Sequence, residues 1–510
     1  MSLQVRRIPR DHNPFPQVGL RLDGGSPRFE GLPHSLAAML REHATLHPDR
    51  EAVVEVGGER LTYRELWDRA SAVAGGLRDQ GLGRGDRVAV RYPAGVDWVV
   101  AFFGTVLAGG ITVVPNIRST ATEMAVVLDD AGVTFDLGPG TTLPHGEPFQ
   151  HDQLGPDDIA AMFYTSGTTG RPKGVPTRHE AFLTNAENMV RTMQLPDDLG
   201  PGLRTLISVP LFHVTGCNSQ LMTALYVGGT AVIIPELDLP TLTRTLGTER
   251  ITFLVTVPAV YALLLRHPSF VDADLRHVRW VGYGGAPIAP SLVADLQAAF
   301  PSAKVFNGYG MTESAALMTG LPHEDAVEQA DSVGYAMPSV ELGILPSDED
   351  PSVGELVARG ANIMKGYWNR PEETAATLVD GWLRTGDMVR VDDRGRVHIV
   401  DRLKDIIIRG GENISSVEVE AALASAPGVL EAAVLAVPDD VMGEKVGAVV
   451  HSGAGSLDID EVLAHCREHL SDFKVPQYLH VSAEPLPRNA GGKVLKATLR
   501  GSVAWGAPLR

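Results

Sequence analysis

The sequence predicts an α/β fold, and a pattern that occurs twice is the main reason. Residues 98–115 and 207–235 carry no charged side chain, and each contains a Gly-Gly pair, a β-branched run and a proline. An apolar stretch that is broken by glycines and then becomes β-branched indicates a helix, a turn and a buried parallel strand. The two copies flank residues 164–175, so we expect two related α/β subdomains with a site between them. Alternating apolar residues in 432–437 and 445–450 predict a small α+β domain near the C-terminus.

Length alone would make both uncharged runs candidates for membrane-spanning helices. The glycine pairs interrupt them, and the second run also contains Pro210, His213 and Gln220, which are unfavourable in lipid. We therefore expect no membrane span. At 510 residues, the chain is long enough for about three average domains.

The charge balance limits the partners that we expect. A formal net charge of −18 argues against general binding of nucleic acid or of an anionic membrane, so an anionic substrate needs a locally basic site. The two cysteines, Cys217 and Cys466, form no disulfide framework and suit a reducing cytosol. Residues 1–10 are partly basic but no apolar run follows them, so we expect no signal peptide and a cytoplasmic protein.

The first part of the chain provides structural elements but little chemistry. Residues 36–46 and 63–77 have the spacing of amphipathic helices, and residues 87–92 read as a strand after a glycine-rich turn. The apolar run 160–164 predicts a buried strand that leads directly into the segment with the clearest chemical signal.

Residues 164–175, Y-T-S-G-T-T-G-R-P-K-G-V, are expected to form a loop at the edge of a sheet. The glycines and Pro172 oppose a regular helix and allow close approach of the backbone. Hydroxyl groups, glycine amides and one lysine suit a polyphosphate, because every group donates and the lysine adds charge. A Walker A loop is excluded, because it needs Ser or Thr after the lysine and this chain has Gly174 there. The alternative to a phosphate-binding loop is a surface linker rich in Ser, Thr and Gly. The residues assigned to the phosphates are Thr165, Ser166, Gly167, Thr168, Thr169, Gly170 and Lys173.

This string resembles the signature of the adenylate-forming superfamily, which includes acyl- and aryl-CoA synthetases, peptide-synthetase adenylation domains and luciferases. Further motifs of that family follow in order, so the resemblance extends from about residue 36 to residue 496. It implies a large N-terminal domain of two related α/β subdomains and a small barrel-like β subdomain, followed by a small mobile α+β lid. We place the boundary between residues 1–401 and 402–510, because segment 401–405 has only one apolar residue and matches the family's hinge.

A second motif, S-V-P-L-F-H-V-T-G at residues 208–216, places a histidine among apolar residues. A lone histidine is usually a hydrogen-bonded core residue, but the resemblance implies that His213 lies in the pocket for the substrate carboxylate. This stretch contains no acidic residue, which argues against activation of amino acids. Its small uncharged side chains favour an apolar acyl or aryl group. The assigned pocket residues are His213, Val214, Thr215, Cys217, Val281, Gly282 and Met311.

Two glycine-containing segments resemble the family's adenine and metal motifs. Residues 280–287 come after a predicted strand at 251–257, and an ordinary strand-to-helix turn is the alternative. In N-G-Y-G-M-T-E, residues 307–313, a tyrosine can stack on a base, and Glu313 can hold Mg²⁺ through oxygen. The alternative for this segment is a glycine turn with a solvated glutamate. The residues assigned to the nucleotide are Gly284, Gly285, Ala286, Pro287, Asn307, Tyr309, Gly310, Met311 and Thr312.

The strings G-Y-W-N-R-P at residues 366–371 and W-L-R-T-G-D at 382–387 also match the family. Asp387 follows a Thr-Gly turn, where an aspartate is usually a turn residue, but the resemblance implies a contact with the ribose hydroxyls. A hairpin is predicted over residues 388–400. The resemblance also implies that Arg402 reaches the ribose and that Lys404 is the hinge residue.

The C-terminal part is expected to form the lid, with a strand at 406–408 and a helix at 417–423. In P-R-N-A-G-G-K, residues 487–493, the last residue falls on the family's catalytic lysine, and a surface lysine in a loop is the alternative. A lysine on a glycine-rich tip can neutralise charge on two substrates at once. The resemblance also implies a loop for thioester formation beside the CoA channel, made of Gly410, Gly411 and Glu412.

The resemblance implies an ATP-dependent carboxylate–CoA ligase. A carboxylate attacks the α-phosphate of ATP in the presence of Mg²⁺, and the resulting acyl-AMP gives acyl-CoA and AMP with CoA. Catalysis is assigned to Lys493, Lys173, Thr312 and Glu313. Medium- or long-chain fatty acids and aromatic acids all fit an uncharged pocket.

Two other functions stay open. A ligase that loads a carrier protein is disfavoured because residues 136–153 are short and no extra insertion is present. A nucleotide-binding protein without catalysis is disfavoured because Lys173, Glu313, Asp387 and Lys493 are all present. The oligomeric state is open, a homodimer included.

Overall fold

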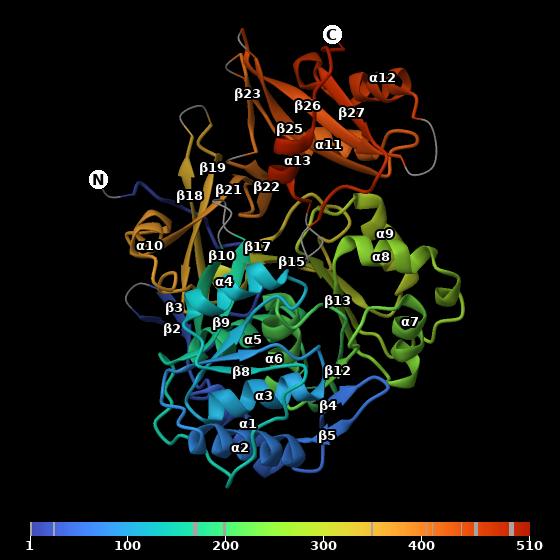
Figure 1. Ribbon diagram of the computed structural model, residues 1–510. Coiled ribbons are helices and arrows are strands. Elements are labelled where there is room, and N and C mark those ends of the chain that lie inside the picture. Colours follow the sequence, from blue (N-terminus) through green and yellow to red (C-terminus); the bar gives the residue numbers. More distant parts are fainter. Residues whose placement is uncertain are drawn as a thin grey trace. The chain divides into compact units, whose positions relative to one another are not determined.

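The computed structural model describes residues 3–23, 26–166, 172–196, 200–347, 350–403, 405–410, 412–439, 441–452, 457–488 and 494–509 (Figure 1). They form two compact units that interleave along the chain. The first comprises Met1–Gly343, Val357–Arg384 and Asp393–Val397, and the second comprises Ile344–Leu356, Thr385–Asp392 and His398–Arg510. The proposed domain boundary after residue 401 stays a prediction.

A five-stranded sheet in the first unit has the order β10-β9-β7-β6-β8. All its pairs are parallel except that of β10, an edge strand antiparallel to β9. Helices α1, α2 and α3 lie together (Figure 1) and contribute to one apolar core with this sheet. The strands are β6 (Arg87–Val90), β7 (Ile111–Val114), β8 (Phe135–Leu137), β9 (Ile159–Ser166) and β10 (Pro172–Arg178). The helices are α1 (Leu36–Leu46), α2 (Tyr63–Asp79), α3 (Val96–Leu107) and α4 (Ala121–Ala131).

A nine-stranded sheet in the same unit has the order β17-β16-β15-β14-β13-β11-β12-β4-β5. Strands β15 to β4 in this order are parallel, and antiparallel strands flank them at both ends. The strands are β4 (Glu51–Glu55), β5 (Arg60–Thr62), β11 (Arg204–Ile207), β12 (Thr230–Ile233), β13 (Phe253–Thr256), β14 (Trp280–Gly284), β15 (Lys304–Met311), β16 (Ala316–Leu321) and β17 (Tyr335–Ala336). The helices are α5 (His179–Met193), α6 (Met222–Tyr226), α7 (Leu239–Thr248), α8 (Pro258–Arg266) and α9 (Pro290–Ala299).

The repeated Gly-Gly pairs end helices α3 and α6 in the same way. Gly109 and Gly228 have φ angles of +82° and +71°, a left-handed conformation that favours glycine at a helix end. The amides of Gly110 and Gly229 then donate to the carbonyl five residues earlier, at 2.9 and 2.8 Å. A Cβ at Gly229 would lie 2.5 Å from Leu203 O, so no larger residue fits there. The repeat in the sequence is therefore a repeat of helix-ending geometry, and each copy leads into a parallel strand.

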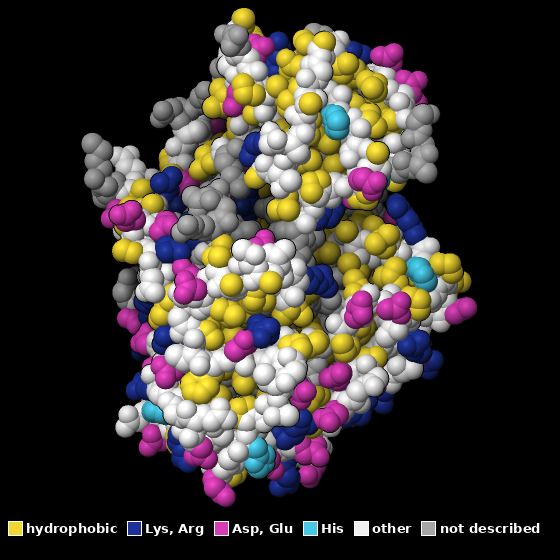
Figure 2. Space-filling model, in the orientation of Figure 1, with side chains coloured by type: hydrophobic (Ala, Val, Ile, Leu, Met, Phe, Trp, Pro, Cys, Tyr) yellow, Lys and Arg dark blue, Asp and Glu magenta, His cyan; other side chains and the backbone are white. Residues whose placement is uncertain are grey.

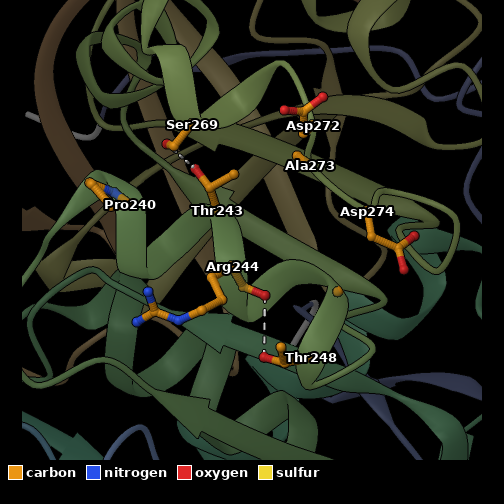
Figure 3. A pocket seen from close by; sticks show the side chains of 9 residues that line it. Pro240, Thr243, Arg244, Thr248, Ser269, Asp272, Ala273 and Asp274 are labelled. Carbon is orange, nitrogen blue, oxygen red and sulfur yellow. Dashed lines mark hydrogen bonds between the residues drawn. The ribbon is translucent and has the colours of Figure 1, made fainter.

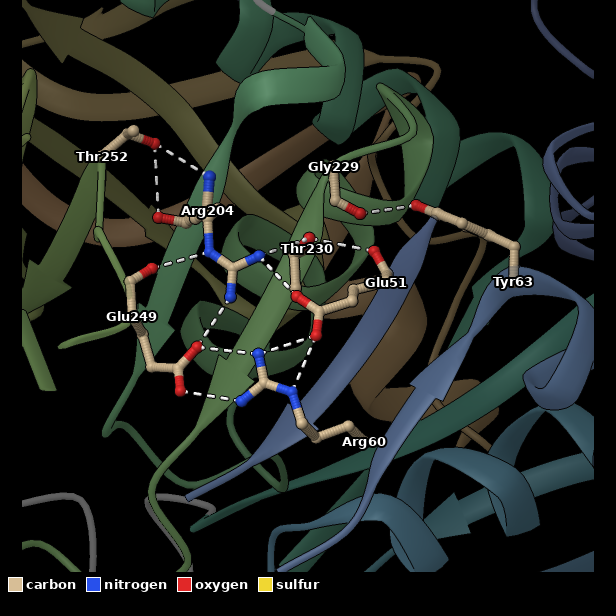
Figure 4. A network of polar contacts seen from close by, with 8 residues as sticks. All are labelled: Glu51, Arg60, Tyr63, Arg204, Gly229, Thr230, Glu249 and Thr252. Carbon is tan, nitrogen blue, oxygen red and sulfur yellow. Dashed lines mark hydrogen bonds and ion pairs between the residues drawn. The ribbon is translucent and has the colours of Figure 1, made fainter. Parts of the chain in front are cut away.

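An ion-pair network joins the amino ends of the parallel strands in the nine-stranded sheet (Figure 4). Arg204, at the start of β11, lies 2.8 Å from Glu51 and 2.8 Å from Glu249. Arg60 of β5 pairs with the same two carboxylates at 2.7 and 2.8 Å. The hydrogen bond from Arg60 is the largest cause that lowers the pKa of Glu249. The network links β4, β5 and β11 to the segment that precedes β13.

A further sheet has the order β1-β18-β19-β21-β20, with β22 paired to β21. Its strands are β1 (Arg6–Arg7), β18 (Val340–Pro346), β19 (Val353–Gly360), β20 (Leu378–Val379), β21 (Trp382–Val391) and β22 (Val397–Arg402). The short helix α10 (Pro371–Thr377) precedes β20, and β2 (Leu20–Asp23) pairs with β3 (Ser26–Phe29) near the N-terminus.

The second unit contains a sheet of order β24-β23-β26-β25, with β27 beside β26. The side chains of its helices α11 and α12 share an apolar core with β25 and β26. The elements are β23 (Ile407–Arg409), β24 (Glu412–Ile414), α11 (Ser416–Ala424), β25 (Glu431–Asp439), β26 (Gly443–His451), α12 (Ile459–His469), β27 (Tyr478–Ser482) and α13 (Lys496–Ser502).

These elements confirm the α/β fold class, and most of the predicted helices and strands end within a few residues of the expected positions. The prediction of a Thr-Gly turn before Asp387 is wrong, because β21 already begins at Trp382 and includes these residues, with Gly386 at a φ of +72°. No helix among the described residues has the length and apolar character needed to cross a membrane. On the face drawn in Figure 2, basic and acidic side chains are interspersed rather than gathered by sign.

The prediction that residues 164–175 form a loop throughout is wrong. The segment belongs to a hairpin in which β9 continues to Ser166 and β10 begins at Pro172, with Lys173 opposite Thr165. A β-branched threonine suits a strand, and proline is tolerated as the first residue of an edge strand because its missing N–H costs no ladder bond. The predicted position at a sheet edge is confirmed, and residues 167–171 lie outside the described part of the chain.

Candidate active site

Lys173 of β10 lies against the segment that carries the string G-Y-W-N-R-P. Its Nζ is 4.9 Å from the centroid of the Tyr367 ring, within range of a cation–π contact. The backbone amide of Trp368 donates to Gly174 O at 2.9 Å. A Cβ at Gly174 would lie 2.8 Å from Met162 Sδ and 3.2 Å from Trp368 Cβ, so a glycine is needed where the two segments meet.

Glu313, from a different segment of the chain, also contacts Tyr367. It lies in a one-turn 3₁₀ helix, Thr312–Ser314, directly after β15, and is only 6% exposed. The Tyr367 hydroxyl donates to Glu313 Oε1 at 2.8 Å, and the amide of Met364 donates to Glu313 O at 2.8 Å. Burial, and then the Glu313 carboxylate, raise the pKa of Tyr367. The structure thus brings Lys173 and Glu313, which are 140 residues apart in the sequence, to one side chain.

Buried asparagines hold the turn that follows Thr312. Asn362 Nδ2 donates to Ser314 O and Leu317 O, both at 2.9 Å. Asn218 Nδ2 donates to Ala315 O at 3.0 Å, and Asn185 Oδ1 accepts from Leu317 N at 3.1 Å. Within this turn, the two alanines at positions 315 and 316 have φ angles of +52° and +116°, which L residues rarely adopt. The asparagines therefore stabilise a strained backbone next to two predicted catalytic residues.

The predicted adenine segment lies at the carboxyl ends of two neighbouring parallel strands. Gly284, the last residue of β14, pairs with Gly308 of β15, and a Cβ at Gly284 would lie 2.3 Å from Gly308 O. Gly285 follows with a φ of +77°, so the chain turns there in a conformation that favours glycine. Ligands of open α/β sheets bind outside the carboxyl ends of the strands, where these glycines and the Tyr309–Met311 end of β15 lie.

The predicted carboxylate pocket is made of residues with different degrees of burial. His213, Val214 and Thr215 are partly buried, at the start of a π-helical turn, Thr215–Leu221. Cys217 is fully buried in an apolar core, and burial raises the pKa of its thiol well above the ordinary value. A Cβ at Gly282 would lie 2.8 Å from the Phe306 ring, so any larger residue at position 282 would displace this ring.

In the second unit, the two predicted ribose-binding residues contact each other. Asp387 is 3% exposed, and Arg402 Nε lies 2.9 Å from Asp387 Oδ1. The amide of Asp387 donates to Thr385 Oγ1 at 3.1 Å, and Gly386 has a φ of +72°. The arginine and the turn therefore fix the position of the Asp387 carboxylate.

A second polar cluster in this unit surrounds helix α13, which follows the predicted catalytic lysine in sequence. Lys496 Nζ lies 2.7 Å from Glu420 Oε1 and 2.7 Å from Ser416 Oγ. Arg500 lies 2.6 Å from Asp405 of the predicted hinge segment. Helix α13 is therefore fixed to α11 and to the end of the hinge segment.

Several predicted site residues lie outside the described part of the chain. They are Gly167, Thr168, Thr169, Gly170, Lys404, Gly411 and Lys493, and the side chain of Ser166 is likewise not described. Gly410 has a φ of +61° and donates to Met442 O at 2.8 Å, and Glu412 begins β24.

Sequence reasoning missed Tyr367 and the three asparagines. Tyr367 was noted only as part of a matching string, although a tyrosine in a Gly- and Pro-flanked segment is a candidate for contact with a site. Asn362 stands between apolar residues, which is a signal for a buried hydrogen bond that must be satisfied, and Asn218 lies within the long uncharged run 207–235.

Glu313 is the predicted ligand for Mg²⁺ in this site. Among the described residues, no group of three or more His, Cys, Asp and Glu side chains could hold a metal ion. Mg²⁺ is usually bound by one or two carboxylates together with waters and substrate phosphates, and Glu313 beside β15 supplies one carboxylate. The residues present therefore fit a magnesium ion that arrives with a nucleotide.

A surface pocket of about 510 Å³ is separate from all the predicted site residues (Figure 3). It lies between α7 and the segment 268–274, where Ser269 Oγ donates to Thr243 Oγ1 at 3.1 Å. Asp272 and Asp274 stand on one wall and Arg244 on the other, and no predicted motif contributes to it.

Comparisons with known proteins identify the family of this chain. The family model for AMP-binding enzymes matches residues 40–142 and 137–368, and that for the C-terminal domain of AMP-binding enzymes matches residues 418–493. A feruloyl-CoA synthase of Amycolatopsis is 36% identical, over 91% of this chain and 96% of that protein. A long-chain-fatty-acid–CoA ligase of Mycobacterium tuberculosis is 32% identical, over 91% of this chain and 97% of that protein.

Solved structures give the same result. The o-succinylbenzoate CoA synthetase of Bacillus subtilis in complex with ATP and magnesium superimposes with a TM-score of 0.83 at 28% identity, over 91% of this chain and 99% of that chain. The family model covers more than half of the sequence, and the relatives are matched over nearly their whole length. The chain therefore belongs to the AMP-binding enzymes, the family that its motifs predict.

Proposed function

We propose that this protein is an ATP-dependent carboxylate–CoA ligase. It converts a carboxylate and ATP to an acyl-adenylate and pyrophosphate, and then transfers the acyl group to CoA with release of AMP. The observation that carries the proposal is the convergence of Lys173 and Glu313 on Tyr367, since one cation and one buried carboxylate are what a magnesium nucleotide needs. The names of the full-length relatives, which include aryl- and acyl-CoA ligases, support it.

The nucleotide would contact several of the matched motifs. The hairpin β9–β10 offers hydroxyls, amides and Lys173 to the phosphates, and the glycines after β14 offer a flat surface to the adenine. Tyr309 would stack on the base, and Asp387 with Arg402 would bind the ribose. Glu313 would hold Mg²⁺, which when bound supplies charge neutralisation at the phosphates.

Catalysis by the chain itself would be positioning and charge neutralisation. The substrate carboxylate is already ionised near neutral pH and needs no general base. Lys173 and Thr312 would orient the phosphates, and Lys493 would neutralise charge on both the carboxylate and the α-phosphate. The buried asparagines beside Thr312 keep its turn in one conformation, so less reorganisation is needed at the moment of reaction.

The acid would be an aromatic acid or a medium- or long-chain fatty acid. The described pocket residues Val214, Thr215, Cys217 and Val281 are uncharged, and His213 lies beside Val214 in the sequence. Feruloyl-CoA synthase and a long-chain-fatty-acid–CoA ligase are relatives of similar identity, which favours both classes equally.

The second half-reaction would use residues of the C-terminal part. We propose that residues 402–510 form a lid that turns about Lys404 after adenylation, and that Gly410, Gly411 and Glu412 then border the channel for CoA. The enzyme would work in the cytoplasm on small molecules. Light scattering would show whether it is a monomer or the homodimer that the sequence leaves open.

The test is pyrophosphate release over a panel of carboxylic acids, followed by analysis of the thioester product. We expect pyrophosphate with at least one aromatic or fatty acid, and a thioester with free CoA. Release of pyrophosphate with a thioester only on a carrier protein would replace the CoA ligase by the carrier-loading alternative. Absence of pyrophosphate with every acid would refute the proposed function.

A further inference from the structure

We infer that Asp130 is a positioning residue of this enzyme, which fixes the two chain segments that hold Lys173 and thereby sets where this cation meets the phosphates. The inference rests on the proposed function for the identity of the ligand, a magnesium–nucleoside triphosphate. Asp130 lies in α4 and belongs to none of the predicted motifs, but it accepts hydrogen bonds from residues of two of them.

Two segments that are far apart in the sequence hold Lys173. Strand β9 pairs with its backbone, with Thr165 opposite Lys173. The segment between β19 and α10, residues 361–370, contacts its side chain through the Tyr367 ring, whose centroid lies 4.9 Å from Nζ. Residues 361–370 contain neither a helix nor a strand, so no ladder of backbone hydrogen bonds fixes them. Their position depends on individual contacts with neighbouring elements.

The carboxylate of Asp130 connects the two segments. The Tyr164 hydroxyl, near the end of β9, donates to Asp130 Oδ2 at 2.9 Å, and Arg370 Nη2 donates to Asp130 Oδ1 at 2.5 Å. Each carboxylate oxygen therefore has a donor from a different segment. The side chain of Asp130 is 12% exposed and that of Arg370 is 30% exposed, so solvent screens this ion pair only partly. Burial, and then the charge of Asp130, raise the pKa of Tyr164, so the hydroxyl remains a donor at neutral pH.

The residues bound to Asp130 lie against the backbone next to Lys173. Tyr164 pairs with Gly174, and a Cβ at Gly174 would lie 3.1 Å from Tyr164 Cζ. From the other segment, the amide of Trp368 donates to Gly174 O at 2.9 Å. Tyr164 and Trp368 also pack against the small apolar cluster that includes Ala131 of α4. A shift of either segment must therefore move the backbone that carries Lys173, because such packed contacts transmit displacement.

Helix α4 itself gives no reason for an aspartate at this position. Asp130 lies in the last turn of α4, which contains no basic residue. A carboxylate is unfavourable at a helix C-terminus, because the helix dipole is negative there. The aspartate is therefore explained by its partners outside the helix, Tyr164 and Arg370.

The test compares ATP with AMP, because a misplaced Lys173 should affect a ligand with three phosphates more than a ligand with one. The affinities of the full-length protein for magnesium–ATP and for AMP are measured by calorimetry, and thermal melting checks that each variant is folded. Asp130→Asn keeps the size of the side chain and removes its charge. Tyr164→Phe is the milder variant, since it removes one hydrogen bond and keeps the ring beside Gly174.

The matched control is Asp325→Asn, which changes the same three types of residue at another place in the same unit. Asp325 Oδ2 accepts from the Tyr335 hydroxyl at 3.0 Å and lies 3.6 Å from Arg396. None of these three residues belongs to the predicted site. A loss of stability alone should therefore appear in both aspartate variants.

For Asp130→Asn, we expect the affinity for magnesium–ATP to fall about tenfold, because a charge-assisted contact with Arg370 is lost, while the affinity for AMP changes by less than about twofold. Tyr164→Phe should lower the ratio of ATP to AMP affinity in the same direction, by about threefold. Asp325→Asn should leave this ratio unchanged. An equal loss for ATP and AMP in Asp130→Asn, or the same change of ratio in Asp325→Asn, would overturn the inference.

A double variant tests whether Asp130 acts through Lys173. Lys173→Met removes the cation and should lower the affinity for magnesium–ATP. If Asp130 only places that cation, adding Asp130→Asn to Lys173→Met should lower the affinity no further. Losses that add in the double variant would contradict the positioning role.

These results are independent of the acid panel. If the ratio of affinities changes as expected but no acid gives pyrophosphate, the ligase function fails and the role of Asp130 stands. If pyrophosphate and thioester form but Asp130→Asn binds ATP as the natural protein does, the function stands and the role of Asp130 fails.

Discussion

Replacing Asn362 with alanine should release the turn of residues 312–317. Asn362 is 1% exposed, and its Nδ2 donates at 2.9 Å to Ser314 O and to Leu317 O. Alanine removes two hydrogen bonds worth about 0.5–1.5 kcal/mol each, and the two buried carbonyls lose a donor. We therefore expect the free energy of unfolding to fall by about 2–4 kcal/mol. The turn contains Ala316 at a φ of +116°, and such strain, about 1–3 kcal/mol, persists only where neighbours enforce it. Relaxation of the turn should therefore displace the predicted catalytic groups on it.

The assay compares this variant with a second buried asparagine. Asn188 is fully buried, and its Nδ2 donates to Ser339 Oγ at 2.8 Å, in the same unit but not in the strained turn. Both Asn362→Ala and Asn188→Ala should lower the melting temperature, but only Asn362→Ala should weaken binding of magnesium–ATP, by about tenfold or more for a loss of about 1.4 kcal/mol or more in orientation of the site. Equal affinity in both variants, measured by calorimetry, would refute the view that Asn362 acts through the turn.

Three further predictions follow from charged residues. Lys493→Ala should abolish pyrophosphate release but spare thioester formation from supplied acyl-AMP, and equal loss of both half-reactions would contradict its assigned role. Lys496→Met removes the cation that lies 2.7 Å from Glu420, whose pKa is already raised above 4.5 by burial. Ionisation of Glu420 then costs more in the folded state, so the variant should lose stability relative to the natural protein as pH rises from 5 to 8. Melting temperatures that change with pH in parallel for the two proteins would argue against this. The pKa of Glu249 is lowered from 4.5 mainly by Arg60, so the ion pair stabilises the fold above pH 4.5, and this stabilisation is lost as pH falls through the lower folded pKa. Arg60→Ala should therefore make the melting temperature less dependent on pH in the acid range. Salt should reduce the difference between the two proteins, because Arg60 is 45% exposed.

The parts of the fold that depend on local geometry were predictable from the sequence. A Gly-Gly pair after an apolar helix ends that helix by contacts within six residues, so the structure around Gly109 and Gly228 depends on residues that are close in the sequence. The hairpin β9–β10 was not predictable in the same way, because a segment rich in Gly, Ser and Thr becomes a strand only where a partner strand offers hydrogen bonds. Tyr367 was missed for a similar reason, since its contact with Glu313 joins positions 54 residues apart.

The positions of charged and uncharged polar residues in the nine-stranded sheet point to one arrangement. At the amino ends of its parallel strands, Arg204 and Arg60 are fully engaged with carboxylates of the protein itself. At the carboxyl end of β15, where ligands of such sheets bind, the side-chain amides of Asn218 and Asn362 hold the backbone of the following turn. Uncharged groups can fix a turn without adding a further charge beside Glu313 and Lys173. In a chain with a net charge of −18, a local cation that is not consumed by the protein is what allows a triphosphate to bind, so replacing Asn218 or Asn362 by a charged residue should harm nucleotide binding more than replacement by an uncharged one.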